Sequence, residues 1–384
     1  MPSWKKPSVR RRHRGGDFFA VLLLLTVLAG LGWLWWEQKH PKPVVKAKMP
    51  ATMQSKAEVR PIELPRPKPI PPAAKLPTSP VVVPAAPVVP AVPAAAADFP
   101  RPVRDGFEAQ VALARRVISP GPIDGAIGSQ TRAAIAAFQR SVKLPETGVL
   151  DTNTRALLPL EAPLLTTYVV TTNDLARLQP LGKTWLAKSK QTVMDYETIL
   201  ELIAEKAHSN PLLIRKLNPD LDWAAVLAGT VIKIPAVVYP EPPEQASFVV
   251  IHLSARYLEA FDQNTNLLAH FPCSIAAKVE KRPVGELHVV VVIANPNYTV
   301  NPELFPESTE LQAIGHKLIL PPGPNNPVGV AWIGLDRPGY GMHGTPVPEL
   351  VGRTESHGCF RLANWDAEYL LKLAWVGMPV EVEP

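Results

Sequence analysis

The sequence predicts a multidomain protein with an N-terminal transmembrane helix, a Pro-rich linker, a small all-α domain, a small α+β segment and a mainly β domain. Three observations predict this order. A long apolar run at residues 18–36 is followed by a stretch in which Pro, Ala, Val and Lys dominate. Helical periodicity appears over residues 107–158, and β-branched and aromatic residues gather in short runs after residue 247. The length of 384 residues allows two or three folded domains.

The N terminus is predicted to anchor the chain. Residues 1–17 form a basic tail, and the apolar run behind them is about as long as a helix that crosses a bilayer. Basic residues on that side favour a cytoplasmic N terminus, which would place the rest of the chain in the periplasm or cell wall. The competing interpretation is a cleaved signal peptide, but no small-x-small cleavage site follows Gly32 at the right distance. Positive flanks are usual for such an anchor, so they do not indicate a nucleic-acid partner.

Residues 37–103 are predicted to be a linker. Their Pro- and Ala-rich composition cannot build a core and favours polyproline II conformations. Some sixty residues at about 3.1 Å each would reach on the order of 180 Å if fully extended. The length suits a tether into the cell wall, and a spacer of no selected length fits equally well.

Residues 104–160 are predicted to be a small helical domain. One helix is expected over residues 129–142, with Ser129 as its cap, and Asp151 is placed to cap a last short helix. The long helix has three apolar residues at the spacing of one buried face: Ile135, Phe138 and Val142. Periodicity alone indicates no more than a small helical bundle.

Two motifs in this domain carry a resemblance. They read Gly121-Pro122-Ile123-Asp124-Gly125 and Ala136-Ala137-Phe138-Gln139. The segment resembles the three-helix peptidoglycan-binding domain, which implies binding to the glycan strands and stem peptides of the wall. We expect exposed polar side chains near Asp124 and Gln139 to form the binding surface.

Residues 164–240 are predicted to form an α+β segment. The pattern predicts strands at 168–171 and 231–235 and a helix at 197–207. A second helix should begin at Ser209-Asn210-Pro211 and end at Asn218-Pro219. Its second half, residues 202–235, is similar to LysM glycan-binding modules, but an inserted stretch around residues 178–195 departs from that pattern. Glycan binding and a structural spacer both stay open.

Residues 247–383 are predicted to be a mainly β domain with one helix. Gln263-Asn264-Thr265-Asn266 indicates a hairpin turn. The helix is expected over residues 364–373. The expected strands are residues 248–253, 258–261, 267–271, 286–294, 317–320, 330–335 and 379–382.

Two motifs near the C terminus carry the chemistry of this domain. They read Met342-His343-Gly344-Thr345 and Ser356-His357-Gly358-Cys359-Phe360-Arg361. Cys359 supplies a thiol nucleophile, and an adjacent imidazole can take its proton and stabilise the resulting ion pair. Gly358 allows close approach of a substrate, and the amides of Gly358 and Cys359 are candidates for an oxyanion hole.

This constellation resembles the active site of the L,D-transpeptidases, over residues 248–382. The resemblance includes Pro283-Val284-Gly285-Glu286, Leu320-Pro321-Pro322-Gly323-Pro324 and Trp332-Ile333-Gly334-Leu335. It implies a β-rich domain and a cysteine acyltransferase that needs no cofactor and no metal. The enzyme would cleave the L-D bond of a tetrapeptide stem, release D-alanine and pass the acyl group to an amine of a neighbouring stem or a wall-linked lipoprotein.

The resemblance also implies roles for single residues. His343 matches the general base of the family, oriented by the backbone of Gly344, whereas His357 would line the oxyanion side or brace the loop. The substrate would be bound by four residues, Arg361, Ser356, Tyr340 and Trp332. For Arg361, pairing with Asp366 is an equal alternative to binding a stem carboxylate. Residues 295–326 lie where the family has a flap over the donor site, although an ordinary connection remains an alternative.

Three other functions fit parts of the same pattern. The His, His, Cys set can also ligate zinc, but no second Cys and no HExxH helix supports that interpretation. Hydrolysis of the same acyl-enzyme would make an L,D-carboxypeptidase, and without catalysis the chain would be a wall-binding scaffold. Cys273 lies in a strand-like context and is interpreted as a small buried hydrophobic residue.

Overall fold

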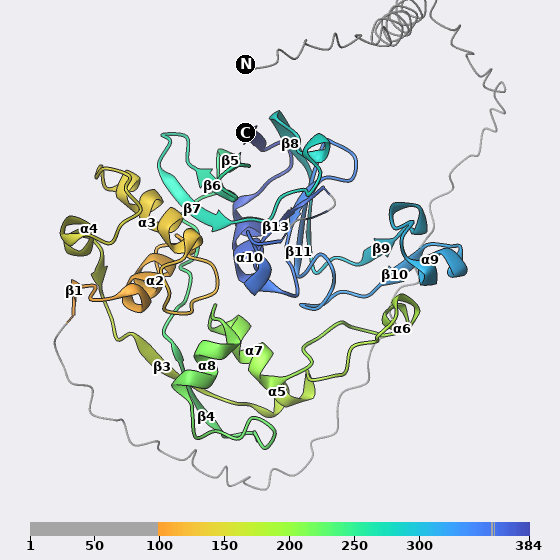
Figure 1. Cartoon of the computed structure of the whole chain (residues 1–384), viewed down its shortest axis with the longest axis horizontal. Helices are drawn as coiled ribbons and strands as arrows, with labels where there is room; N and C mark the ends of the chain where they lie inside the picture. Colours follow the sequence, from red (N-terminus) through yellow and green to blue (C-terminus); the bar gives the residue numbers. More distant parts are fainter. Residues whose placement is uncertain (1–98, 355, 357) are drawn as a thin grey trace, which may run out of the picture. The chain divides into compact units, whose positions relative to one another are not determined.

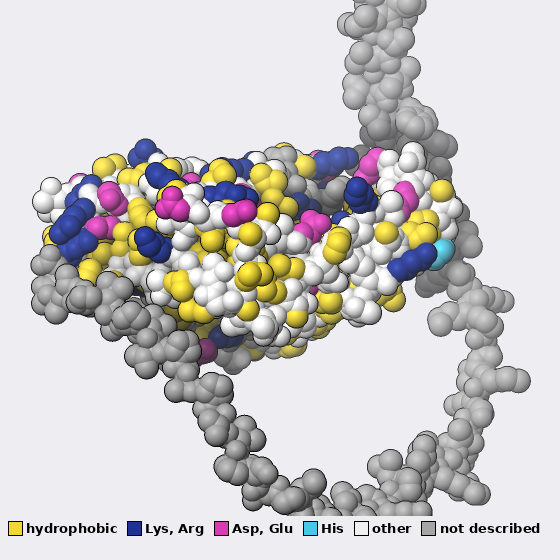
Figure 2. Space-filling view, turned by 90° about the horizontal axis from the view of Figure 1, so that it is seen from below, with side chains coloured by type: hydrophobic (Ala, Val, Ile, Leu, Met, Phe, Trp, Pro, Cys, Tyr) yellow, Lys and Arg dark blue, Asp and Glu magenta, His cyan; other side chains and the backbone are white. Residues whose placement is uncertain are grey.

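The computed structural model describes residues 99–384 except residues 355 and 357. The predicted basic tail, transmembrane helix and most of the linker therefore lie outside the described residues. Within the described part of the chain, every helix is too short or too polar to span a bilayer. On the face seen in Figure 2, cationic and anionic side chains are mixed with hydrophobic ones, so the positive charge is not gathered in a single patch there.

The first folded part is the predicted helical domain. Its elements are β1 (Arg101–Pro102), α2 (Gly106–Ala114), α3 (Ser129–Ser141), α4 (Thr152–Leu157) and β2 (Pro159–Leu160). β1 pairs with β2, so the fold includes residues that were predicted to end the linker. Ile135 and Phe138 are buried in its core, as the spacing predicted, and the third residue of that face, Val142, is partly buried against it.

Of the two helix caps predicted in this domain, one is confirmed and one is wrong. Asp151 caps α4 because its carboxylate accepts a hydrogen bond from the amide of Thr154. Ser129 is not a cap, because it is the first residue of α3 and Gly128 occupies the N-cap position without a side-chain bond.

Gln139 is also not part of an exposed surface. It is 1% exposed, and its amide nitrogen donates to Thr147 Oγ1 at 3.0 Å and Thr154 Oγ1 at 2.8 Å. Its side chain therefore joins α3 to the turn before α4. Gln139 itself is therefore not one of the exposed polar side chains expected there, and the place of the wall-binding surface stays a prediction.

The second part contains the predicted strands and helices of residues 164–240. Its elements are β3 (Leu165–Val169), α5 (Thr172–Ala176), α6 (Trp185–Ser189), α7 (Ile199–Lys206), α8 (Pro211–Leu217) and β4 (Val231–Pro235). β3 pairs antiparallel with β4. α8 begins after an Asn210 cap and ends before Asn218, as predicted. The likeness of this part to LysM stays a prediction.

The third part is built on a curled sheet of eight strands in the order β13-β12-β11-β8-β14-β5-β6-β7 (Figure 1). The strands are β5 (Phe248–His252), β6 (Tyr257–Phe261), β7 (Leu267–Pro272), β8 (Gly285–Ala294), β11 (Ala331–Leu335), β12 (Gly341–His343), β13 (Phe360–Arg361) and β14 (Pro379–Glu383). α10 (Asn364–Leu373) packs against β8 and β11. Alternating residues of these strands, with one side of α10, form a single core that includes Phe271, Phe360 and Leu370.

The connection between β8 and β11 has its own small structure. It contains the antiparallel pair β9 (Tyr298–Val300) and β10 (Leu318–Leu320), with α9 (Thr309–Ile314) between the two strands. The short 3₁₀ turn η2 (Pro302–Leu304) also lies in this connection. Two other 3₁₀ turns lie outside it: η1 (Val279–Lys281) precedes β8, and η3 (Pro348–Leu350) follows β12.

Both edges of the eight-stranded sheet are covered. At β7, the amide of Ser119 donates to His270 O at 2.8 Å and the amide of His270 donates to Val117 O at 3.0 Å. At β13, Ser274 and Arg361 exchange backbone hydrogen bonds of 2.9 and 3.1 Å. Because residue 274 directly follows β7, one segment of chain joins the two ends of the sheet, and the helical domain covers the outer side of β7.

Candidate active site

The two strands at one end of the sheet place the two predicted motifs side by side. β12 and β13 are parallel, with Met342 opposite Phe360 and His343 opposite Arg361. The amide of Leu362 continues the pairing by donating to His343 O at 2.8 Å. Cys359 directly precedes β13, so the two motifs that are separate in the sequence lie on adjacent strands.

His343 is held by its surroundings in one orientation. Its ring is 4% exposed and stacks on Trp332, with ring centroids 5.5 Å apart. Nδ1 lies 2.6 Å from the carbonyl oxygen of Gly344. A carbonyl can only accept, so Nδ1 carries the proton and Nε2 is left as an acceptor. The backbone of Gly344 thus orients the ring as expected, and Trp332 contacts this base.

The resting thiol and imidazole are both neutral at pH 7. Burial lowers the pKa of His343 to about 4, and the charge of Arg361 lowers it further, while the bond to Gly344 opposes this. Burial raises the pKa of Cys359 to about 11, against the opposing effects of the Gly341 backbone and Arg361. Both shifts favour the neutral form over the expected thiolate–imidazolium pair, because burial favours neither charge.

Ser356 organises the loop that carries the thiol. Its side chain is buried, and its hydroxyl donates to Cys359 O at 2.6 Å while accepting from the amide of Gly358 at 3.2 Å. Its own amide donates to Ile275 O at 2.8 Å. These bonds fix the backbone on both sides of residue 357, and they engage one of the two amides that were candidates for the oxyanion hole.

Two tyrosines lie near this loop. A Cβ added at Gly358 would lie 3.6 Å from the ring of Tyr340, so Tyr340 covers the backbone beside the thiol. Burial raises the pKa of Tyr298, the Cys359 thiolate adds to that rise and Arg361 opposes it, which places Tyr298 within electrostatic range of both. Tyr298 belongs to β9, in the connection where a flap was expected. It was missed because a lone Tyr in a connection has no distinguishing sequence signal.

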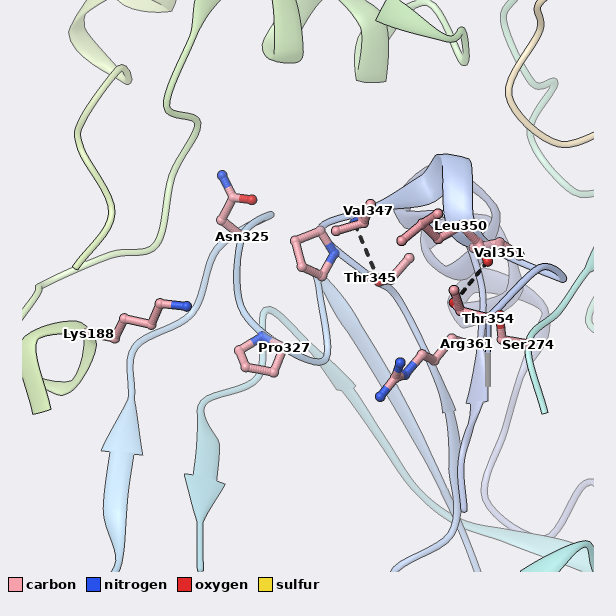
Figure 3. Close-up of a pocket in the computed structure, with 11 residues that line it drawn as sticks. Lys188, Ser274, Asn325, Pro327, Thr345, Val347, Leu350, Val351, Thr354 and Arg361 are labelled. Carbon is pink, nitrogen blue, oxygen red and sulfur yellow. Dashed lines mark hydrogen bonds between the residues drawn. The ribbon is translucent and has the colours of Figure 1, made fainter. Parts of the chain in front are cut away.

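A cavity of about 260 Å³ lies beside Arg361 (Figure 3). Of the predicted site residues that the structure describes, Arg361 alone lines it. The cavity is thus next to the thiol loop, and none of Cys359, His343, Tyr340 or Trp332 belongs to its wall. Arg361 does not use Asp366 as its partner, because that carboxylate accepts from Ser119 Oγ at 3.0 Å and Tyr239 Oη at 2.8 Å.

The remaining predicted residues are placed as follows. His357 lies outside the described residues, so its role stays a prediction. Cys273 is fully buried, as expected, and burial raises the pKa of its thiol to about 12. Among residues 99–384 apart from 355 and 357, no three His, Cys, Asp or Glu side chains are grouped as metal ligands. His357, which with His343 and Cys359 makes up the alternative zinc set, is not among these residues.

Comparison with known proteins identifies two domains. Residues 246–382 match the family described as L,D-transpeptidase catalytic domain, and residues 107–158 match the family described as "Putative peptidoglycan binding domain". Both resemblances stated for these segments are thereby confirmed.

Similar proteins share the name of the first family. "Putative L,D-transpeptidase YkuD" of Bacillus licheniformis is 26% identical over 185 residues, which are 48% of this chain and 93% of that protein. "Probable L,D-transpeptidase YcfS" of Escherichia coli is 27% identical over 53% of this chain and 65% of its own length. The solved L,D-transpeptidase 3 of Mycobacterium tuberculosis is 15% identical over 42% of this chain and 77% of its own, with a TM-score of 0.29.

Proposed function

From an L,D-transpeptidase catalytic domain and a peptidoglycan-binding domain in one chain, we propose an anchored enzyme that cross-links peptidoglycan. Cys359 attacks the L-D peptide bond of a tetrapeptide stem, releases D-alanine and transfers the acyl group to an amine of a neighbouring stem. The observation that carries the proposal is the parallel pairing of β12 with β13, which places a buried, oriented His343 beside the strand that follows Cys359.

The chemistry follows from a neutral pair. Nε2 of His343 takes the thiol proton as Sγ bonds to the scissile carbonyl carbon, so the charged thiolate is formed only during attack. The resulting oxyanion faces the amide of Cys359, and Arg361 adds a positive charge near the sulfur. The imidazolium then returns its proton to the nitrogen of D-alanine as the C–N bond breaks, which leaves a thioester.

The second half-reaction reverses these roles. An acceptor amine attacks the thioester carbon, His343 takes a proton from that amine, and the Cys359 thiol is regenerated as the new amide forms. Water in place of the amine would give L,D-carboxypeptidase activity through the same acyl-enzyme. The anchor at residues 18–36 would hold the chain at the inner membrane, and residues 107–158 would hold it to the wall.

The proposal is tested with purified protein and defined tetrapeptide muropeptides, reading products by mass. Wild type should release D-alanine and form dimers, and a carbapenem should add one covalent adduct to the intact protein. Cys359→Ala should lose product and adduct, whereas Cys273→Ala should retain both because that thiol is buried away from solvent. Hydrolysed tripeptide without dimers would favour the carboxypeptidase, and an adduct on Cys359→Ala would contradict the assignment of the nucleophile.

A further inference from the structure

The inserted stretch at residues 178–195 packs on the connection between β8 and β11. Figure 1 shows α6, which belongs to this stretch, beside β10 and α9. The Trp185 and Phe305 rings lie 5.9 Å apart, and the amide of Leu186 donates to Glu310 Oε1 at 3.0 Å. The stretch that departs from the LysM pattern is therefore one side of an interface with the catalytic domain.

A shared core makes this interface rigid. Met194 is fully buried together with Val300, Leu311, Leu318 and Leu320 of the connection. The amide of Met194 donates to Pro322 O at 2.8 Å, and the amide of Asn325 donates to Met194 O at 2.9 Å. Gly323 has φ +141°, and a Cβ there would lie 2.2 Å from Met194 O, so the two backbones are in direct contact.

This packing places Lys188 of α6 in the wall of the cavity beside the active site. Figure 3 shows Lys188 reaching in from one side and Arg361 from the other. Nζ of Lys188 lies 5.7 Å from the centroid of the Trp185 ring, which supports the side chain. Lys188 belongs to α6 and Arg361 to β13, so the two cations come from parts of the chain that are far apart in the sequence.

The described residues of the cavity wall carry positive charge that no described carboxylate of the lining balances. Its described lining contains no Asp or Glu, and its polar residues besides the two cations are Ser274, Asn325, Thr345 and Thr354. Nε of Arg361 is buried without a hydrogen-bond partner among the described residues. Glu310 lies within electrostatic range of Lys188, but its carboxylate is engaged by the amide of Leu186 and is not part of the lining.

We propose that Lys188 and Arg361, on opposite walls of this cavity, form a cationic subsite for the carboxylates of the stem peptide. The proposal rests on the proposed function for the identity of the ligand, since stem peptides carry free carboxylates next to the bond that is cleaved. A cationic wall of this kind favours an anionic ligand, because charge-assisted hydrogen bonds to a carboxylate are stronger than neutral ones. The inserted stretch is thereby part of the substrate site.

The test compares Lys188→Met with Lys190→Met, a matched control because Lys190 is exposed on the same stretch and does not line the cavity. Each is given a tetrapeptide stem with free carboxylates and the same stem with those carboxylates amidated. Lys188→Met should raise KM for the free-carboxylate stem about two- to fivefold, a range typical of losing one partly exposed ionic contact. It should leave kcat and the amidated stem unchanged, and Lys188→Arg should restore KM.

Equal effects of Lys188→Met on both stems, or no effect on either, would overturn the subsite. Equilibrium binding of the two stems to Cys359→Ala protein, with and without Lys188→Met, gives the same comparison without turnover. If wild type cleaves neither stem while binding still prefers the free carboxylate through Lys188, the proposed function fails and the subsite stands.

Discussion

The neutral state of the resting pair gives a prediction that can be measured directly on Cys359. With a pKa of about 11, the thiol should be about one part in 10⁴ thiolate at pH 7. A free cysteine with a pKa of about 8.5 would be about 3% thiolate, or about 300 times more. A more basic thiolate is about tenfold more nucleophilic, so alkylation by iodoacetamide should be about thirtyfold slower than that of free cysteine.

The sign of the pH dependence follows from the direction of the shift. Because the pKa of Cys359 is raised, thiolate appears only as pH rises, so alkylation should increase about tenfold for each pH unit between 7 and 10. Intact-mass measurement over time gives the rates, and Cys359→Ala protein corrects for labelling of Cys273. A rate that stays constant from pH 5 to 8 would show a thiolate–imidazolium pair at rest and refute the reasoning.

Acylation by a carbapenem should behave differently, because it uses His343 as base. The neutral imidazole is lost only as pH falls through about 4, so acylation should be nearly constant from pH 6 to 8. His343→Ala should slow it at pH 7 by roughly the 10²–10⁴-fold typical of losing a general base, with recovery as pH rises. Loss without recovery would assign His343 a structural role.

Two further predictions concern stability. Burial raises the pKa of Glu205 to about 7, so its carboxyl favours the folded state below about pH 4.5 and loses that contribution, about 3 kcal/mol, as pH rises to about 7. Between pH 5 and 8 the Tm of Glu205→Gln should therefore fall less than the Tm of the wild type. The same pH dependence of Tm in both proteins would contradict this. Gly323→Ala should cost about 1–3 kcal/mol in urea unfolding because of its φ and its contact with Met194. Gly229→Ala, with positive φ but open space around the site, should cost less, and equal costs would rule out the contact as the cause.

Local signals explain what could be predicted from the sequence. The cap at Asn210, the helix over residues 364–373 and the strands on either side of the 263–266 turn depend on neighbouring residues, and all are present. The Cys359 and His343 motifs could be recognised because the chemistry requires those residue types together with glycine. Their placement on adjacent parallel strands was not evident from spacing, because β12 and β13 are too short to show a pattern.

The remaining features depend on long-range packing. Gln139 is polar at the end of a helix, which suggested exposure, yet its amide replaces backbone partners in a turn that local sequence does not reveal. The protonation states of Cys359 and His343 could not be predicted from the sequence either, because they depend on how deeply the folded chain buries the two side chains. Lys188 lines the cavity because the inserted stretch packs on the β9–β10 connection, and Tyr298 belongs to β9 of that connection.

The pairing of residues 117–119 with β7 has a consequence for how the chain can be divided. A catalytic fragment lacking the helical domain would expose the unpaired backbone of an edge strand, a template for aggregation. It would also leave Asp366 without Ser119, one of its two hydroxyl partners. A loss of activity in such a fragment would then reflect its lower solubility and not the loss of wall binding. Recombination faces the same restriction: a replacement for the helical domain must bring its own segment to close β7, whatever else it binds.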